Sequence, residues 1–222
     1  WIDAFEENPE MISYNQSLYF KGIHNSLNAL YMTYKPQKFF EGFQKYLSLR
    51  NVVYETGNVN DISSYELFKN IHLLNHIILS ADYDGGVKEI KELTKILKSN
   101  EYSWDTNRLM VFYYKVACVY FGADDFSQSL EYLNKIINYP VTNLRLDIQA
   151  FARILSLIAH YELGNETLVK YQIMSVYKFL SKQQDLQMVQ KEIFNFLRKT
   201  PRIERKDIKK EFIKLREALM KY

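Results

Sequence analysis

The spacing of apolar residues is the feature of this sequence that most restricts its fold. Along most of the chain, apolar side chains recur every three or four positions and do not alternate, as Val87, Ile90, Leu93 and Leu97 illustrate. Such spacing places an apolar stripe along one side of an α-helix. The 222 residues include only 7 glycines and 4 prolines, so few positions interrupt these helices. The sequence therefore predicts an all-α fold.

Helix-breaking residues and polar turns divide the chain into successive predicted helices. The first covers residues 9–34 and ends before Pro36, because the residue that precedes a proline avoids the helical conformation. The polar segment 51–61 is a predicted loop, and Ser63 and Ser64 are the predicted N-caps of the helix after it. Further helices are expected from Pro36 onward and at about residues 87–97, 109–121, 126–139, 145–163, 166–180, 185–199 and 205–222.

The predicted turns recur at a regular interval. Those near Lys35, Asp84, Ala123 and Gly164 lie about 40 to 50 residues apart, which is the period of helical-hairpin arrays. A single hairpin cannot cover its own apolar stripe on both sides. We therefore expect the hairpins to stack on one another as a superhelix.

The segment from Tyr113 to Pro140 is the most regular of these hairpins. Its first helix combines a large aromatic Tyr113, a small Ala117 and Tyr120, and its second helix carries the small Ser129. This pattern resembles the tetratricopeptide repeat over about residues 63–180. The resemblance implies a right-handed α-α superhelix of about four hairpins over residues 1–200, followed by a C-terminal helix. The other matching positions are Val116, Leu133 and Ile136, whereas Leu157 departs from the pattern and Pro140 comes one residue early.

The resemblance also implies a binding groove. In that family the first helices of the hairpins line a concave surface that holds a peptide or a partner helix, and the proteins are scaffolds without catalytic residues. The groove positions carried over are Val111, Tyr114, Cys118, Phe121, Phe151, Ile154, Ile158 and Tyr161. Such a groove would favour an apolar or amphipathic segment. The alternative is that these side chains fill the space between hairpins, because aromatic stripes at helical spacing usually belong to a core.

Candidate chemistry is sparse in this sequence. His72 and His76 lie four residues apart in one predicted helix and are the candidate metal ligands. No metalloprotease glutamate and no third ligand accompany them, so packed histidines are the favoured interpretation. Cys118 lies in an apolar run without a neighbouring base, which is typical of a buried cysteine. We expect no cofactor and no enzymatic activity.

The C-terminal segment has a different composition. Residues 198–222 hold ten lysines or arginines and four acidic residues. We predict that residues 201–222 form a basic amphipathic helix that caps the stack. Its apolar positions form a narrow seam at Ile208, Phe212, Leu215, Leu219 and Tyr222. Two alternatives remain open: the seam docks a partner or a second copy of the chain, or the basic face binds nucleic acid or a membrane surface.

The overall charge restricts the kind of partner. The formal net charge is only +3, which is low for a chain that binds phosphate backbones. No apolar run approaches the roughly 20 residues that span a bilayer. We therefore predict a cytoplasmic, non-catalytic scaffold that binds a protein or peptide partner of unknown identity. The alternative is a structural or oligomerisation module that acts through its basic C-terminal helix.

Overall fold

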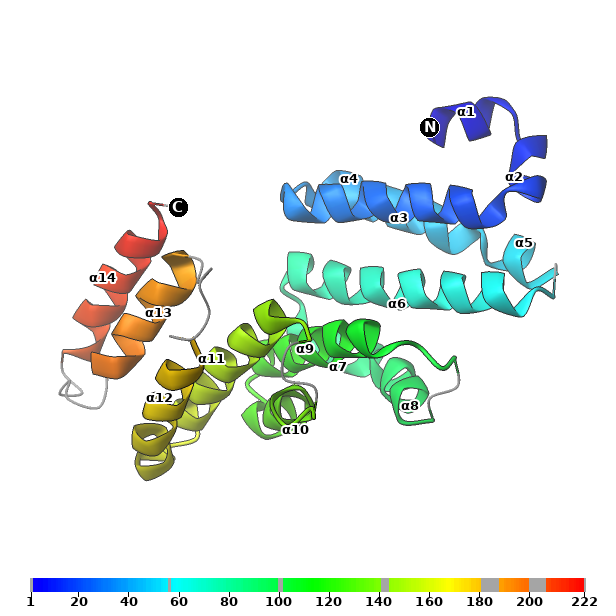
Figure 1. Ribbon diagram of the computed structural model, residues 1–222. Coiled ribbons are helices and arrows are strands. Elements are labelled where there is room, and N and C mark those ends of the chain that lie inside the picture. The colour runs from blue at the N-terminus through cyan, green and yellow to red at the C-terminus, as the bar shows by residue number, and fades with distance from the viewer. Residues whose placement is uncertain are drawn as a thin grey trace. The chain divides into compact units, whose positions relative to one another are not determined.

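Every regular element in the computed structural model is α-helical (Figure 1), over described residues 2–55, 57–99, 102–140, 144–180, 188–199 and 207–221. The prediction of an all-α fold is thus confirmed. The chain divides into two compact units, Trp1–Ala123 and Asp124–Tyr222. This division falls inside the single repeat domain predicted for residues 1–200. The predicted boundary between residues 200 and 201 lies outside the described residues.

The first unit contains the helices from α1 to α9. These are α1 (Ile2–Glu7), α2 (Glu10–Tyr14), α3 (Gln16–Met32), α4 (Pro36–Ser48), α5 (Arg50–Glu55), α6 (Val59–Ser80), α7 (Tyr83–Glu89), α8 (Lys91–Ser99) and α9 (Thr106–Gly122). Helices α3 and α4 form a hairpin, and α6 packs against both of them. Helix α9 packs in turn against α6 and α7.

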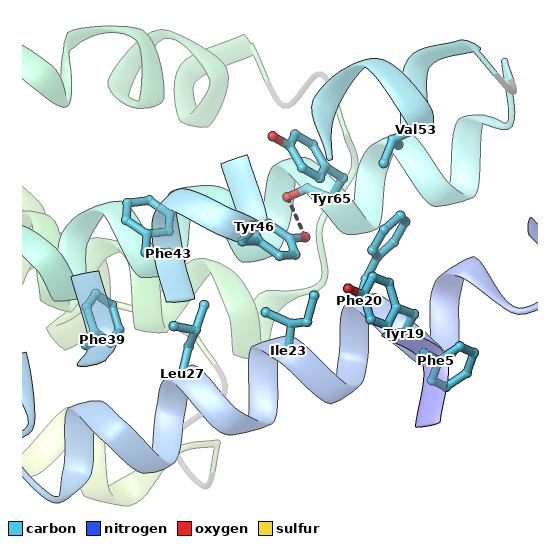
Figure 2. Close-up of a cluster of buried hydrophobic side chains, with 10 residues drawn as sticks. All are labelled: Phe5, Tyr19, Phe20, Ile23, Leu27, Phe39, Phe43, Tyr46, Val53 and Tyr65. Atoms are coloured by element: carbon cyan, nitrogen blue, oxygen red, sulfur yellow. Dashed lines mark hydrogen bonds between the residues drawn. The ribbon is translucent and has the colours of Figure 1, made fainter. Parts of the chain in front are cut away.

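The core of the first unit is rich in aromatic side chains (Figure 2). Its fully buried members come from five helices and are Phe5, Tyr19, Phe20, Ile23, Leu27, Phe39, Phe43, Tyr46, Val53 and Tyr65. The rings of Tyr46 and Tyr65 stack with their centroids 5.1 Å apart. The Tyr46 hydroxyl donates to the Tyr65 carbonyl oxygen at 3.3 Å, and the Tyr65 hydroxyl donates to the Leu47 carbonyl oxygen at 3.2 Å. These bonds satisfy both phenols inside an apolar cluster.

Two glycines allow helices of this unit to approach closely. A Cβ atom at Gly86 would collide with the Ile77 side chain of α6, and one at Gly122 would collide with the Tyr83 ring of α7. Gly86 follows a second glycine, Gly85. In the structure both lie inside α7, where Asp82 caps the helix by accepting from the Gly85 amide.

Four local predictions were wrong. The single helix expected at about residues 87–97 is divided at Ile90 between α7 and α8. Residues 50–55 are helical (α5), although 51–61 was expected to be a loop. Helix α6 starts at Val59 because the Asn58 side chain accepts from the Asn60 and Asp61 amides, so Ser63 and Ser64 lie inside the helix and not at its cap. The helix predicted over residues 9–34 is interrupted at Asn15, whose backbone departs from the helical region.

The second unit contains the remaining helices. These are α10 (Phe126–Ile137), α11 (Leu146–Glu162), α12 (Glu166–Leu180), α13 (Met188–Lys199) and α14 (Ile208–Leu219). Helix α11 packs against α10, which precedes it in the chain, and against α12, which follows it. Helix α13 contacts α11, α12 and α14. The core of this unit joins residues of α11, α12 and α13, namely Ala150, Ile154, Leu157, Val169, Ile173, Val176 and Phe196.

Candidate functional site

Polar side chains meet where α6 packs against α3 and α9. His24 and Asn28 come from α3, His72 and Asn75 from α6, and Lys115 from α9. The two residues of α3 are four positions apart and the two of α6 are three apart, so the side chains of each pair share a face of their helix. We call these five residues the polar relay.

The relay is a continuous chain of hydrogen bonds. The Lys115 ammonium donates to Asn75 Oδ1 at 2.7 Å, and Asn75 Nδ2 lies 3.4 Å from His72 Nδ1. His72 Nε2 is 2.9 Å from His24 Nδ1. The amide group of Asn28 lies 3.0 Å from His24 Nε2.

The ammonium at one end sets the direction of the bonds from Lys115 to His24. Lys115 can only donate, so Asn75 accepts with its oxygen and donates from its nitrogen to His72 Nδ1. The proton of His72 is therefore on Nε2 and is donated to His24 Nδ1.

The electrostatic surroundings keep both histidines neutral. Burial, followed by the proximity of His24 and Lys115, lowers the pKa of His72 to about 3. Burial, followed by the charges of Arg108 and Lys21, lowers the pKa of His24 to about 4. Burial also lowers the pKa of Lys115 to about 8. At pH 7 the relay thus holds one cation and two neutral imidazoles.

Aromatic rings enclose the relay. The His24 ring stacks on Phe68 with centroids 4.0 Å apart, and the Lys115 ammonium lies 4.6 Å from the centroid of the Tyr31 ring. His72 is fully buried and Asn75 nearly so, whereas His24 and Asn28 are partly exposed. The relay therefore leads from the interior of the first unit to its surface.

The structure does not pair the two histidines of the candidate metal site. His72 bonds to His24, while His76 lies against the rings of Phe40 and Phe43 at centroid distances of 5.3 and 6.3 Å. In the part of the chain that the structure describes, no three His, Cys, Asp or Glu side chains are grouped to hold a metal ion.

The predicted groove residues of α9 are all partly buried. These residues are Val111, Tyr114, Cys118 and Phe121. Burial raises the pKa of the Cys118 thiol to about 11, and the Tyr114 hydroxyl shares a hydrogen bond with that thiol. Cys118 is thus a protonated thiol at neutral pH, which does not suit a nucleophile.

In α11 the predicted groove residues contribute to the core of the second unit. Ile154 is 3% exposed and belongs to the core cluster, so the prediction that it faces a partner is not supported. Ile158 and Tyr161 are partly buried against the same cluster. Phe151 is also partly buried.

The predicted C-terminal seam is described only in part. Leu215 of α14 packs against the core of the second unit, and Leu219 is partly buried. The side chains of Ile208 and Phe212, together with Tyr222, lie outside what the structure describes. The contact of Leu215 favours the capping interpretation of this helix.

Sequence reasoning missed four of the five relay residues. Lys115 carried a usable signal, because it is the one charged residue in the apolar segment 109–121. His24 and Asn28 are spaced for one helix face, but nothing local distinguishes them from exposed polar residues. His24 bonds to His72 of α6, which is 48 residues away, and only the fold brings these two residues together.

Comparison of the chain with protein families, curated proteins and solved structures finds no match. Among the described helices, none has the length and apolar character needed to cross a membrane.

Proposed function

We propose that this chain is a non-catalytic protein-interaction scaffold of tetratricopeptide-like hairpins. In this proposal, a peptide or helical segment of a partner binds along the face that successive first helices form. In the first unit this face consists of α3, α6 and α9, and we call it the first-helix face.

The order of helix contacts is the observation that carries the proposal. Each first helix contacts the next one, α3 with α6 and α6 with α9. Each second helix also contacts the following first helix, α4 with α6 and α7 with α9. In the second unit, α11 and α12 both contact α13. Stacked helical hairpins are expected to give this pattern of contacts.

A repeated backbone feature gives further support. A residue in the left-handed conformation follows each of four helices, at Tyr34, Ala81, Asp124 and Gly164. The residues six positions before these four left-handed residues are Asn28, Asn75, Cys118 and Ile158. Positions ten residues before them include His24 and Tyr114. His24, Asn28 and Asn75 thus occupy the register of the groove positions predicted in α9, whereas His72 and Lys115 each lie one position later.

The geometry of the first-helix face suits binding without rearrangement. The relay bonds and the surrounding rings hold His24 in one orientation, so a partner would not have to order it. Partly exposed His24 and Asn28 supply polar contacts, and partly exposed Phe68 and Tyr31 supply apolar ones. An amphipathic segment would match this mixture.

The experiment compares binding by matched variants of the whole chain. A partner is captured from lysate with the intact chain, and its dissociation constant is then measured for Asn28→Ala and for the control Tyr171→Ala. Tyr171 is 75% exposed on α12 and lies outside the proposed face. We expect Asn28→Ala to weaken binding about tenfold and the control to leave it unchanged. Equal affinities for all three folded proteins would refute the proposal.

One observation favours the alternative function as a structural or oligomerisation module. Ile213 on the basic helix α14 is 50% exposed, and Met220, which follows the last residue of that helix, is 75% exposed. Analytical ultracentrifugation of the intact chain and of a truncation before Pro201 tests this alternative. Self-association that disappears with the truncation would favour it, whereas a monomer in both cases would exclude it.

A further inference from the structure

A polar cavity of about 550 Å³ lies in the first unit where α3 and α6 begin. Figure 1 shows these two helix starts at the same end of that unit. The side chains used below, Tyr14, Gln16, Ser17, Leu18 and Asp61, all line the cavity. None of them belongs to the polar relay.

Gln16 gives the cavity an unmet hydrogen-bonding requirement. Its side chain is 8% exposed, and its Oε1 atom is buried without a hydrogen-bond partner. An unpaired buried amide oxygen destabilises a folded protein. This position therefore calls for a donor that the described residues do not supply.

Asp61 gives the cavity a negative charge. The Ser17 hydroxyl donates to Asp61 Oδ1 at 2.6 Å, which orients the carboxylate. No ion pair among the described residues uses Asp61. Because Ser17 belongs to the first turn of α3, the carboxylate also offsets the partial positive charge at that helix start.

The rest of the wall is apolar or aromatic. Tyr14 is 85% exposed and Leu18 is 42% exposed. An aromatic ring attracts a cation to its face, and a leucine side chain can cover an aliphatic stem.

We propose that this cavity binds the guanidinium group of an arginine side chain from a partner polypeptide. The guanidinium donates to the Asp61 carboxylate and, after the Gln16 side chain rotates toward the cavity, to Gln16 Oε1, and the aliphatic stem lies against Leu18. Arginine suits two separate acceptors because its donors are arranged in a planar fork and its charge is weakly hydrated. A lysine ammonium is a compact, strongly hydrated charge and would serve the two acceptors less well. This inference does not depend on the proposed function of the first-helix face.

The test uses the intact chain and N-acetyl-arginine amide as the probe, with binding followed by NMR chemical shifts. N-acetyl-citrulline amide, a neutral analogue of similar shape, and N-acetyl-lysine amide serve as comparison ligands. We expect the arginine derivative to shift the Gln16 side-chain amide saturably, the lysine derivative to bind more weakly and the citrulline derivative not to bind. Equal binding of the citrulline derivative, or no binding of the arginine derivative, overturns the proposal.

Variants separate the role of the cavity from general effects of charge. Asp61→Asn is expected to weaken binding of the arginine derivative about fivefold. The control variant Asp3→Asn removes an exposed carboxylate at a neighbouring cavity and is expected to leave that binding unchanged. Gln16→Met is expected to weaken binding about tenfold and yet to raise the Tm of the free chain by about 2 to 4 °C, because it removes an unpaired acceptor. An unchanged or lower Tm for Gln16→Met, or an equal effect of Asp3→Asn, contradicts the assignment.

Discussion

At the scale of single residues, the main feature is a largely buried ammonium group that donates a hydrogen bond to a side-chain amide. Lys115 donates to Asn75, and Asn75 connects it to the two imidazoles. Asn75 bonds to both the ammonium and His72, so its loss removes two of the four relay hydrogen bonds. A buried polar network stabilises a fold only when every member is satisfied.

We expect Asn75→Ala to lower the free energy of unfolding by about 2 to 4 kcal/mol, because the variant leaves a largely buried ammonium without its acceptor and the Nδ1 atom of a buried imidazole without its donor. Urea unfolding of the intact chain and the variant measures the difference. Asn25→Ala is the matched control, since Asn25 is exposed on α3. Its expected effect is below about 0.5 kcal/mol. A similar loss in both variants would contradict the importance of the relay.

The two relay histidines predict lower stability in mild acid. Their pKa values in the fold, about 3 for His72 and about 4 for His24, lie below the ordinary value of 6.5. Below pH 6.5 the unfolded chain therefore binds protons that the folded chain does not, and stability falls until the pH reaches the folded pKa values. The expected loss is about 1.4 kcal/mol per pH unit for His72 and less for the partly exposed His24.

The charged groups around the relay act in the same direction. Lys115, Lys21 and Arg108 all oppose protonation of the pair. Urea midpoints at pH 7, 6 and 5 measure the decline in stability. A His72→Gln variant, which keeps hydrogen-bonding capacity without titrating, should show a shallower decline. Parallel profiles for the two proteins would show that His72 is not the source.

At the scale of helices, a glycine is required where two helices pack so closely that a Cβ atom would collide with the neighbouring helix. We expect Gly86→Ala to destabilise the first unit by about 1 to 3 kcal/mol, because the added Cβ collides with Ile77 across the contact of α6 and α7. This loss exceeds the gain of about 1 kcal/mol that alanine usually gives inside a helix.

Gly22→Ala is the matched control for this prediction. Gly22 also lies inside a helix, α3, but its added Cβ would make only an ordinary contact of 3.7 Å with Ile2. This variant is therefore expected to stabilise the chain by about 0.5 to 1 kcal/mol. Thermal unfolding of both variants checks the prediction, and a shift in the same direction for the two would contradict it.

At the scale of the whole molecule, the core is unevenly distributed. The first unit buries an aromatic cluster shared by five helices, whereas α14 exposes Ile213 and places Leu215 only partly inside, and Met220 directly after this helix is also exposed. Stability in a helical array depends on the contacts of each repeat with its neighbours.

We expect native-state hydrogen exchange to be slowest in α3, α4 and α6 and fastest in α14. Helices α3, α4 and α6 surround the fully buried Phe20, Phe39 and Tyr46, so their amides should open only by unfolding of the first unit. Mass spectrometry of proteolytic fragments after timed exchange measures this order. Protection of α14 equal to that of α3 would show that the terminal helix is as firmly held as the core.

Local sequence signals predicted most of the helices but not all of their limits. The three- and four-residue spacing located α9, α10, α11 and α12 closely, because that periodicity is the direct cause of an amphipathic helix. It missed α5, since a six-residue helix contains too few apolar positions to show a period. It also placed the start of α6 too late, because serine and asparagine are both good caps and local sequence does not choose between them.

For the candidate site, spacing along one helix was informative only where both partners lie on that helix. The sequence paired His72 with His76 because they are four residues apart, but the packing of α3 on α6 gives His72 a different partner, His24. Likewise, Ile154 matched a groove position by register, and the packing of α11 against its neighbours buried it.

The local order of apolar and polar residues is sufficient to predict that this chain is helical and where most of its helices lie. Helix packing alone establishes that Lys115, Asn75, His72 and His24 form one hydrogen-bonded chain and that Gln16 and Asp61 line one cavity. These contacts join residues as far as 48 positions apart. Which helix faces meet depends on the packing of all the side chains together, and no local segment of the sequence contains that information.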